Sequence, residues 1–446
     1  MKLRNIVAGA NASIYYRFNF KNIKRVFYPK DQNDVRDAID YARNHGYDVT
    51  PKGAGSGLSG ACTGGNRERV IISTLQMNKI MDVSIDEGYV DVQPGATPDE
   101  INAILQPKNV KFWVAPSSRD VATVGGILNT DGGGNDTWVN GTMRDNTLKV
   151  RMMLYDGHQI SVDQNGVESD DTNLQDKLNQ EGLTIDDIAS SHGTLGFITQ
   201  LRVAIRPFPD ENLTGALVEY EDYDTMGRTI DEMVSRNSPI RYGESIVMAH
   251  DDVRENLSPP LQILEFPSNY ADELNEITDY KELTEAELEK LKETRIKLPK
   301  KNPKDGRQLA LFEGYGLHDD SLRNMSNSID QINEVLQNHG FIPLVKYGHA
   351  PSKWYLGNNE EAYGMIMHSR EIRPEAQSGK RVFQTVLALL DRCKELGITP
   401  KPEHKWPFSD TEKKSRIAEL RKVVGDGFNS FILQEDCATP TLRTMV

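Results

Sequence analysis

Short segments of alternating hydrophobic and polar residues fill the first two hundred positions and predict small strands joined by helices. Val35, Ile39 and Ala42 recur at helical spacing, with Asn33 as the expected cap and Gly46 as the stop. The β-rich runs that follow are Val70–Ser73, Ile80–Ser84, Tyr89–Val92 and Val150–Leu154. A second helix is predicted after Thr97-Pro98-Asp99-Glu100, where Thr97 caps the helix and Glu100 bonds back to the cap.

The pattern changes after Pro207. Glycine-rich loops become rarer, residues 272–300 read as a charged helical stretch, and a strand at Leu309–Glu313 precedes a helix near Ser321–Asn338. This change predicts a domain boundary, with one domain over residues 1–208 and another over residues 209–446.

Composition limits the possible functions. The chain has 446 residues, of which 37% are hydrophobic and 26% charged, as in globular proteins. Its formal net charge of −14 argues against nucleic-acid binding, and an anionic substrate would need a local cluster of cations. Three separated cysteines cannot hold a four-cysteine iron–sulfur cluster. No run of about 18 apolar residues occurs, so we expect no transmembrane segment. We therefore expect a cytoplasmic protein, with a peripheral position at a membrane left open.

Residues 51–60, PKGAGSGLSG, carry the clearest chemical signal. Gly55, Gly57 and Gly60 spell G-x-G-x-x-G, which indicates a dinucleotide site only where it joins a strand to a helix. A β-rich run begins at Val70, which leaves no room for that helix, so the Rossmann interpretation is rejected. The glycines still suit a loop whose backbone N–H groups converge on an anion, with a flexible surface turn as the alternative.

Three further loops are rich in glycine and short polar residues. They read PSSRDVATVGG from Pro116, GTMRDN from Gly141 and SSHGTLGFIT from Ser190. Such loops suit a buried polar ligand held by backbone groups and short side chains.

In order and spacing, PKGAGSGLSG, VDVQPGAT, APSSRDVATVGG, GTMRDN and SHGTLGFIT resemble the PCMH-type FAD-binding domain of the vanillyl-alcohol oxidase superfamily. The closer similarity is to the group of D-lactate dehydrogenases, D-2-hydroxyglutarate dehydrogenase and the glycolate oxidase flavin subunit. The resemblance implies an α+β fold: a two-subdomain FAD-binding domain, then an α+β, ferredoxin-like substrate or cap domain. We expect this second domain to be incomplete at its carboxyl end.

The resemblance also implies an FAD site, with non-covalent binding because no His or Cys stands where relatives attach the cofactor. The residues implied at the pyrophosphate are Pro51, Gly53, Ala54, Gly55, Ser56 and Gly57. Those implied along the flavin and its ribityl chain are Pro116, Ser117, Thr123, Gly125, Gly126, Asn129, Gly133 and Asn135. Gly193 and Ile198 are implied on the adenine side.

Two positions depart from the family pattern. His192 stands where relatives carry an acidic residue, and Asp131 begins a run that is Ala-Gly-Gly in relatives. We expect the Asp131 carboxylate to oppose the charge of a reduced, anionic flavin.

In the second domain the resemblance rests on Glu244, on Arg370-Glu371 and on residues 434–440. Arg370 matches an arginine that pairs with the substrate carboxylate in relatives, a task for which its planar fork is suited, and a surface arginine is the alternative. In relatives the base and metal-binding histidines lie in a G-H-x-G-D-x-N-x-H-like segment and a later E-H pair beyond the stretch matching residues 434–440. The chain ends at Val446, so no metal site is expected. His368 lies two residues from Arg370, and on a helix the two side chains would face different ways.

The resemblance predicts an FAD-dependent oxidoreductase that oxidises a small anionic D-2-hydroxy acid (lactate, glycolate or 2-hydroxyglutarate class) by hydride transfer to flavin. Its electron acceptor would be a quinone, a flavoprotein or an iron–sulfur subunit. Two alternatives stay open: a non-catalytic or truncated FAD-binding subunit, and a protein that binds another nucleotide such as a UDP-sugar.

Overall fold

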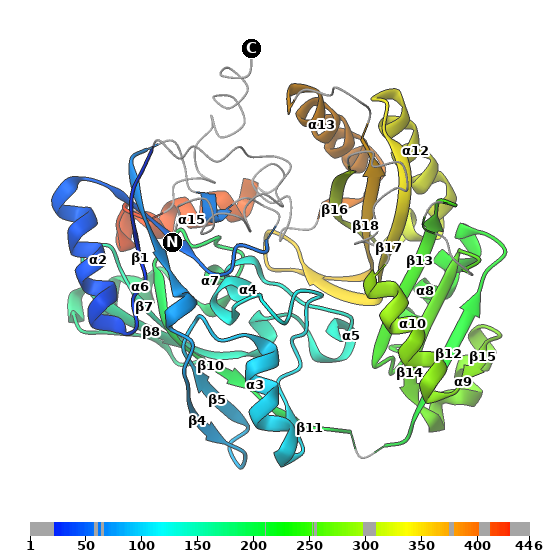
Figure 1. The fold of residues 1–446 in the computed structure, drawn as a ribbon, viewed down its shortest axis with the longest axis horizontal. Helices are drawn as coiled ribbons and strands as arrows, with labels where there is room; N and C mark the ends of the chain where they lie inside the picture. The colour runs from blue at the N-terminus through cyan, green and yellow to red at the C-terminus, as the bar shows by residue number, and fades with distance from the viewer. Residues whose placement is uncertain are drawn as a thin grey trace. The chain divides into compact units, whose positions relative to one another are not determined.

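The computed structural model describes residues 22–57, 61–63, 67–209, 211–251, 253, 257–297, 309–373, 379–400 and 411–428. The chain divides into two compact units (Figure 1). Unit 1 contains residues 1–133, 142–208 and 410–446, and unit 2 contains residues 134–141 and 209–409. The single predicted boundary near Pro207 therefore describes only one of the places where the chain passes between units. Within the described residues, no helix is long and apolar enough to cross a membrane.

Unit 1 begins with a parallel three-stranded sheet in the order β1-β3-β2, formed by β1 (Ile23–Phe27), β3 (Arg69–Ser73) and β2 (Asp48–Lys52). Helix α2 (Gln32–His45) buries Val35, Ala38, Ile39 and Ala42 in the adjoining core. Its cap is Asp31, whose side chain accepts from the N–H groups of Asn33 and Asp34. The predicted cap, Asn33, lies instead in the first turn, because Asp31 is the residue with extended backbone angles.

An antiparallel six-stranded sheet forms the rest of the unit 1 framework, in the order β4-β5-β10-β7-β8-β9. Its strands are β4 (Ile80–Ser84), β5 (Tyr89–Val92), β7 (Thr147–Met153), β8 (Gln159–Asp163), β9 (Gly166–Ser169) and β10 (Phe197–Ala204). The short strands β6 (Val110–Lys111) and β11 (Arg206–Pro207) pair separately. The helices are α3 (Pro98–Leu105), α4 (Val124–Thr130), α6 (Thr172–Gln180) and α7 (Ile185–Ile188). The predicted capping box of Thr97 and Glu100 is confirmed at the start of α3.

The last described helix, α15 (Thr411–Val424), returns to unit 1 (Figure 1). Arg416 forms a two-bond ion pair with Asp187 on α7, and Phe428 enters the core beside Val49. Charged and apolar contacts both bind this segment to unit 1, which is why the predicted second domain does not extend to the last described residues.

Unit 2 is built on an antiparallel eight-stranded sheet in the order β15-β12-β14-β13-β17-β18-β16-β19. The strands are β12 (Leu213–Glu219), β13 (Tyr242–Ala249), β14 (Leu261–Pro267), β15 (Lys281–Leu283), β16 (Leu309–Leu317), β17 (Ile342–Tyr355), β18 (Glu361–Ile372) and β19 (Thr399–Pro400). The helices are α5 (Thr137–Asn140), α8 (Tyr223–Ser235), α9 (Ala271–Ile277), α10 (Glu285–Lys297), α11 (Asp319–Arg323), α12 (Met325–Asn338) and α13 (Gly379–Glu395). The succession strand, helix, strand, strand occurs twice, as β12-α8-β13-β14 and β16-α12-β17-β18, which confirms the ferredoxin-like expectation.

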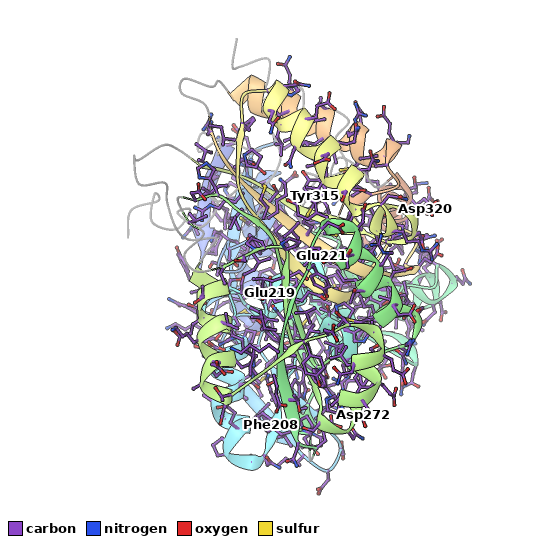
Figure 2. All side chains as sticks on the ribbon, turned by 90° about the vertical axis from the view of Figure 1, so that its right-hand side faces the viewer. Phe208, Glu219, Glu221, Asp272, Tyr315 and Asp320 are labelled. Carbon is purple, nitrogen blue, oxygen red and sulfur yellow. The ribbon has the colours of Figure 1, made fainter. Side chains whose placement is uncertain are left out.

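The region 272–300 is not one helical stretch. It is divided by β15, in which Leu283 is buried and joins the apolar cluster beneath α10. Figure 2 views unit 2 from the side of its helices, where Glu221, Asp272 and Asp320 are labelled and all three are exposed. Part of the negative charge of the chain therefore lies on this side of unit 2.

Candidate functional site

In unit 1, the glycine-rich loop after β2 meets the turn that precedes α4. A Cβ atom at Gly53 would lie 2.3 Å from Thr123 Oγ1, so only glycine fits at this contact. The Thr123 hydroxyl is buried and has no hydrogen-bond partner among the described residues. Buried polar atoms are normally hydrogen-bonded, so this oxygen fits a site that a polar ligand completes.

Helix α4 is held in place by the VDVQPGAT loop. The N–H of Gly125 donates to Pro94 O at 2.9 Å, and the N–H of Val124 donates to Ala96 O at 2.8 Å. These bonds fix the start of α4, and with it Thr123, relative to β5.

Asn129, on α4, binds the loop at residues 190–193. Its Oδ1 accepts from the N–H of Gly193 at 3.0 Å and from Ser191 Oγ at 3.2 Å, and its backbone oxygen accepts from His192 N–H. Gly193 has a φ of +73°, and a Cβ there would lie 3.3 Å from Pro51 Cγ. The loops at residues 51–57 and 190–193 therefore converge on α4 and its cap Thr123, although the three segments are distant in sequence.

The structure brings together Pro51, Gly53, Thr123, Gly126, Asn129 and Gly193, with Gly125 at the base of the cluster. Ala54, Gly55 and Ser56 continue the first loop half-buried, and Gly57 is exposed. Pro116 and Ser117 lie in a turn closed by the Arg119 N–H to Pro116 O bond, with Ser117 exposed. Ile198 is buried in β10, opposite Met152.

Gly133 and Asn135 are separated by the division of the chain. Gly133 is the last residue of its segment in unit 1, whereas Asn135 belongs to unit 2, where its Nδ2 donates to Glu244 Oε2. The contact that the structure gives for the Asn135 side chain is thus with a residue of its own unit. The short segment 134–141 is fixed to unit 2 by this bond and by a bond of 2.9 Å between Thr137 Oγ1 and Ser352 Oγ.

Asp131, at the end of α4, forms a buried ion pair. Arg144 Nε lies 2.6 Å from Asp131 Oδ2, and the Arg144 N–H and the Thr142 hydroxyl both donate to Oδ1. Both charged side chains are about 5% exposed or less. The Asp131 charge is thus neutralised by an arginine of the GTMRDN loop, and the expected unbalanced carboxylate beside the flavin is not present.

A second cation approaches this ion pair from α15. Lys413 Nζ donates to the backbone oxygen of Asp186. Burial, followed by the nearby Arg144 charge, lowers the pKa of the Lys413 ammonium to about 8, against the carboxylates of Asp187, Asp131 and Asp186, which raise it. The returning helix is therefore coupled electrostatically to the loop that follows α4.

In unit 2, Arg370 and His368 lie on β18, not on a helix. Side chains two residues apart on a strand project from the same face, so the two share one face of the sheet. The interpretation that they face different ways is wrong, because it assumed helical rather than strand periodicity.

The same face carries His349 and Glu244, which are direct partners across β17 and β13. His349 Nδ1 lies 3.2 Å from Glu244 Oε2, and Glu244 is fully buried. The His349 ring also meets the His368 ring edge-on, with 5.4 Å between their centroids. Arg370, His368, His349 and Glu244 therefore form one polar cluster, which we call the β-face cluster.

Sequence reasoning missed His349, although a signal existed. Gly348-His349 matches the start of the G-H-x-G-D-x-N-x-H pattern expected beyond residue 440, with Pro351 and Ser352 at its Gly and Asp positions. Among the described residues, no group of three His, Cys, Asp or Glu side chains could hold a metal ion. Residues 434–440, the other part of this resemblance, lie outside the described residues.

Comparison with known proteins agrees with this geometry. Residues 23–163 match the FAD binding domain family, and most of these residues belong to unit 1. A solved structure of alkyldihydroxyacetonephosphate synthase matches with a TM-score of 0.66 at 15% identity, over 90% of this chain and 75% of that one. The fold is therefore a PCMH-type FAD-binding fold followed by an α+β unit, as the sequence motifs predicted.

Curated relatives match over part of their length. D-2-hydroxyglutarate dehydrogenase of Pseudomonas putida (strain KT2440) is 31% identical over 172 residues, which make up 37% of this chain and 16% of that protein. Glycolate oxidase subunit GlcD of Bacillus subtilis (strain 168) is 26% identical over 210 residues, 47% of this chain and 42% of that protein. The matched segments span less than half of these relatives.

Proposed function

We propose that the protein is an FAD-dependent oxidoreductase that oxidises a D-2-hydroxy acid to the 2-oxo acid. The observation that carries the proposal is the convergence of the glycine-rich loop and the start of α4 around the buried Thr123 hydroxyl, within the segment that matches the FAD binding domain family. The loop at residues 190–193, beyond that segment, contacts both. The names of the matched relatives, D-2-hydroxyglutarate dehydrogenase and a glycolate oxidase subunit, support the substrate class.

The loops of unit 1 suit non-covalent binding of FAD. The backbone N–H groups of residues 53–57 would hold the pyrophosphate, since glycine permits close approach of the backbone to an anion. Thr123, Gly125, Gly126 and Asn129, with Pro116 and Ser117, would line the flavin and its ribityl chain. Gly193 and Ile198 would lie on the adenine side.

Arg370 would bind the substrate carboxylate through its planar, bidentate fork. In a 2-hydroxy acid the hydroxyl and the carboxylate are on adjacent carbons, so the proton acceptor must lie close to this arginine. His368 fits, because Cα atoms two residues apart on a strand are separated by roughly 6.5 Å and their side chains share a face. Its imidazole would take the hydroxyl proton as the C2–H bond breaks. Bound FAD would accept the hydride from C2.

Each turnover leaves two electrons that must pass to an acceptor. We propose a quinone, a flavoprotein or an iron–sulfur subunit for this role, and a cytoplasmic site of action. The first test is the absorption spectrum of the purified protein, followed by anaerobic addition of glycolate, of D-lactate and D-2-hydroxyglutarate, and of the L-enantiomers of these last two acids. Flavin bands that a D-acid bleaches, and its L-enantiomer does not, support the proposal. Bound flavin that none of the acids reduces favours a non-catalytic flavin-binding subunit, and the absence of flavin after incubation with FAD contradicts the proposal.

A further inference from the structure

Lys52, the last residue of β2, lies beneath the glycine-rich loop of unit 1. It is only 2% exposed. Its Nζ donates to Gly53 O at 3.3 Å and to Ala54 O at 3.2 Å. A buried lysine thus holds the first two carbonyl groups of the loop.

These two bonds determine where the amide groups of the loop point. In a trans peptide unit the C=O and the N–H point in opposite directions. Since the carbonyl groups of Gly53 and Ala54 point toward Lys52, the N–H groups of Ala54 and Gly55 point away from it. Those two N–H groups are among the donors that would hold the FAD pyrophosphate.

Lys52 has no counter-charge among the residues that the structure describes. Among the described residues, no carboxylate forms an ion pair with it, and its hydrogen-bond partners are the two neutral carbonyl groups. An ammonium has three N–H donors, so one is left for another acceptor. Burial lowers the pKa of the Lys52 ammonium. A buried charge without a counter-ion is costly, so its retention points to an anion supplied by a ligand.

Neighbouring polar atoms indicate the same place. Ser73, which pairs with Lys52 across the parallel strands β2 and β3, has a buried hydroxyl without a hydrogen-bond partner among the described residues. Thr123 Oγ1, which contacts the loop at Gly53, is likewise buried without a hydrogen-bond partner among the described residues. A buried cation and two unsatisfied hydroxyls around one glycine-rich loop match the needs of bound FAD, with the diphosphate at Lys52 and the ribityl chain at Thr123.

We propose that Lys52 is a positioning residue for the FAD diphosphate, which it serves both as a counter-charge and by turning the loop amides outward. This inference rests on the FAD binding proposed above, but not on the proposed substrate. The inference can be tested with three flavins that differ in phosphate content: FAD carries a diphosphate, FMN a single phosphate and riboflavin none. Loss of Lys52 should therefore weaken binding of FAD most, FMN less and riboflavin least.

The test is titration of the apoprotein with FAD, FMN and riboflavin, followed by flavin fluorescence, for the wild type, Lys52→Met and Lys52→Arg. We expect Lys52→Met to weaken FAD binding by about 10- to 100-fold, the range of a charge-assisted contact, and riboflavin binding by less than about two-fold. Lys52→Arg should recover part of the loss. Lys24→Met is the matched control, because Lys24 is a partly exposed lysine on β1, in the same sheet as β2, and is paired with Glu68.

The outcomes separate this inference from the function it rests on. Equal losses of FAD and riboflavin binding would mean that Lys52 only supports the fold of the loop, and unchanged FAD binding in Lys52→Met would mean that it does not act at all. Either result overturns the inference alone. A wild-type protein that binds no flavin overturns the proposed function and the inference together. If Lys52→Met does not fold, as judged by circular dichroism, the ratio of the FAD to the riboflavin dissociation constant is compared between Lys52→Arg and Lys24→Met. A ratio that equals that of the wild type in both variants overturns the inference.

Discussion

The flavin loops of unit 1 and the β-face cluster of unit 2 are built in different ways. The first site uses backbone groups and glycines in short contiguous loops, positioned by contacts such as Gly53 against Thr123. The second uses charged and aromatic side chains from three strands, with Glu244 and His349 separated by 105 residues. Apart from the charge of Lys52, the difference predicts that steric changes will damage the first site and that changes of charge or donor geometry will damage the second.

The largest effect should come from Arg370→Gln. If Arg370 binds the substrate carboxylate, its loss should lower kcat/KM by more than about 10³-fold, or about 4 to 5 kcal/mol, since a charge-assisted pair is removed. The flavin spectrum and the melting temperature should stay near those of the wild type. Steady-state kinetics and anaerobic flavin reduction with a D-2-hydroxy acid measure the effect.

Arg370→Lys keeps the charge but loses the planar fork, so it should recover only part of the activity. Arg323→Gln, at an exposed arginine on α11, is the matched control. If the flavin of Arg370→Gln is reduced by substrate as fast as that of the wild type at low substrate concentration, the carboxylate is bound elsewhere. The predicted dependence of the β-face cluster on charge then fails.

The second effect concerns the buried ion pair of Asp131 and Arg144, which uses charged side chains although the flavin loops of unit 1 rely mainly on backbone groups. Asp131→Asn leaves the arginine without its buried counter-charge, which should lower the free energy of unfolding by about 3 to 4 kcal/mol. Urea unfolding followed by fluorescence measures this loss. Asp163→Asn, at a more exposed carboxylate paired with Lys149, should cost less than about 1 kcal/mol. Equal costs for the two variants would show that the buried pair has no special weight.

The sequence predicted the two sites to different extents for physical reasons. The flavin loops could be read directly, because each is a local run of glycine and hydroxyl residues whose chemistry does not depend on distant partners. The contact of Glu244 with His349 depends on the register of β13 and β17, which no local pattern specifies. His368 was misjudged because β18 was taken as helical, and periodicity decides which side chains share a face.

The segments that change units were equally hard to predict. Asn135 binds Glu244 within unit 2, and Arg416 and Phe428, at the end of the described chain, belong to unit 1. These placements follow from tertiary contacts, whereas the composition of each segment shows only that it is polar or amphipathic. The strands at Val70–Ser73, Ile80–Ser84 and Tyr89–Val92 and the helix capped by Thr97, by contrast, were predicted within a few residues because their caps and alternation are local.

The third effect is a dependence on pH through Lys413. Its folded-state pKa is lowered to about 8, from 10.5 in the unfolded chain. Between these values the unfolded chain holds a proton that the folded protein has lost, so the free energy of unfolding rises with pH across this window. The difference of about 2.5 units corresponds to roughly 3 kcal/mol. The change should be absent in Lys413→Met, measured by urea unfolding from pH 8 to pH 10.5.

Lys422→Met, at an exposed lysine of the same helix, should keep the pH dependence of the wild type. A Lys413→Met protein whose stability rises with pH as steeply as that of the wild type would show that Lys413 is hydrated in solution. In that case α15 is not packed against the loop after α4 as the contacts with Asp186 and Arg144 indicate.

The smallest effect tests the steric half of the comparison most directly. Gly53→Ala places a methyl group where Thr123 Oγ1 lies 2.3 Å away, so the loop or α4 must shift, and FAD should bind about 30-fold more weakly, or about 2 kcal/mol. Adding Thr123→Ala removes that oxygen and leaves the Thr123 Cβ, 3.6 Å from the new methyl, as the nearest atom in an ordinary contact. The double variant should therefore bind FAD more tightly than the sum of the two single losses allows, which a double-mutant cycle of dissociation constants measures. Additive losses would mean that the two loops do not touch in solution. Coupling of the expected sign would establish that the flavin site depends on the space between the Gly53 backbone and the Thr123 side chain, while the β-face cluster depends on the charges that its side chains carry.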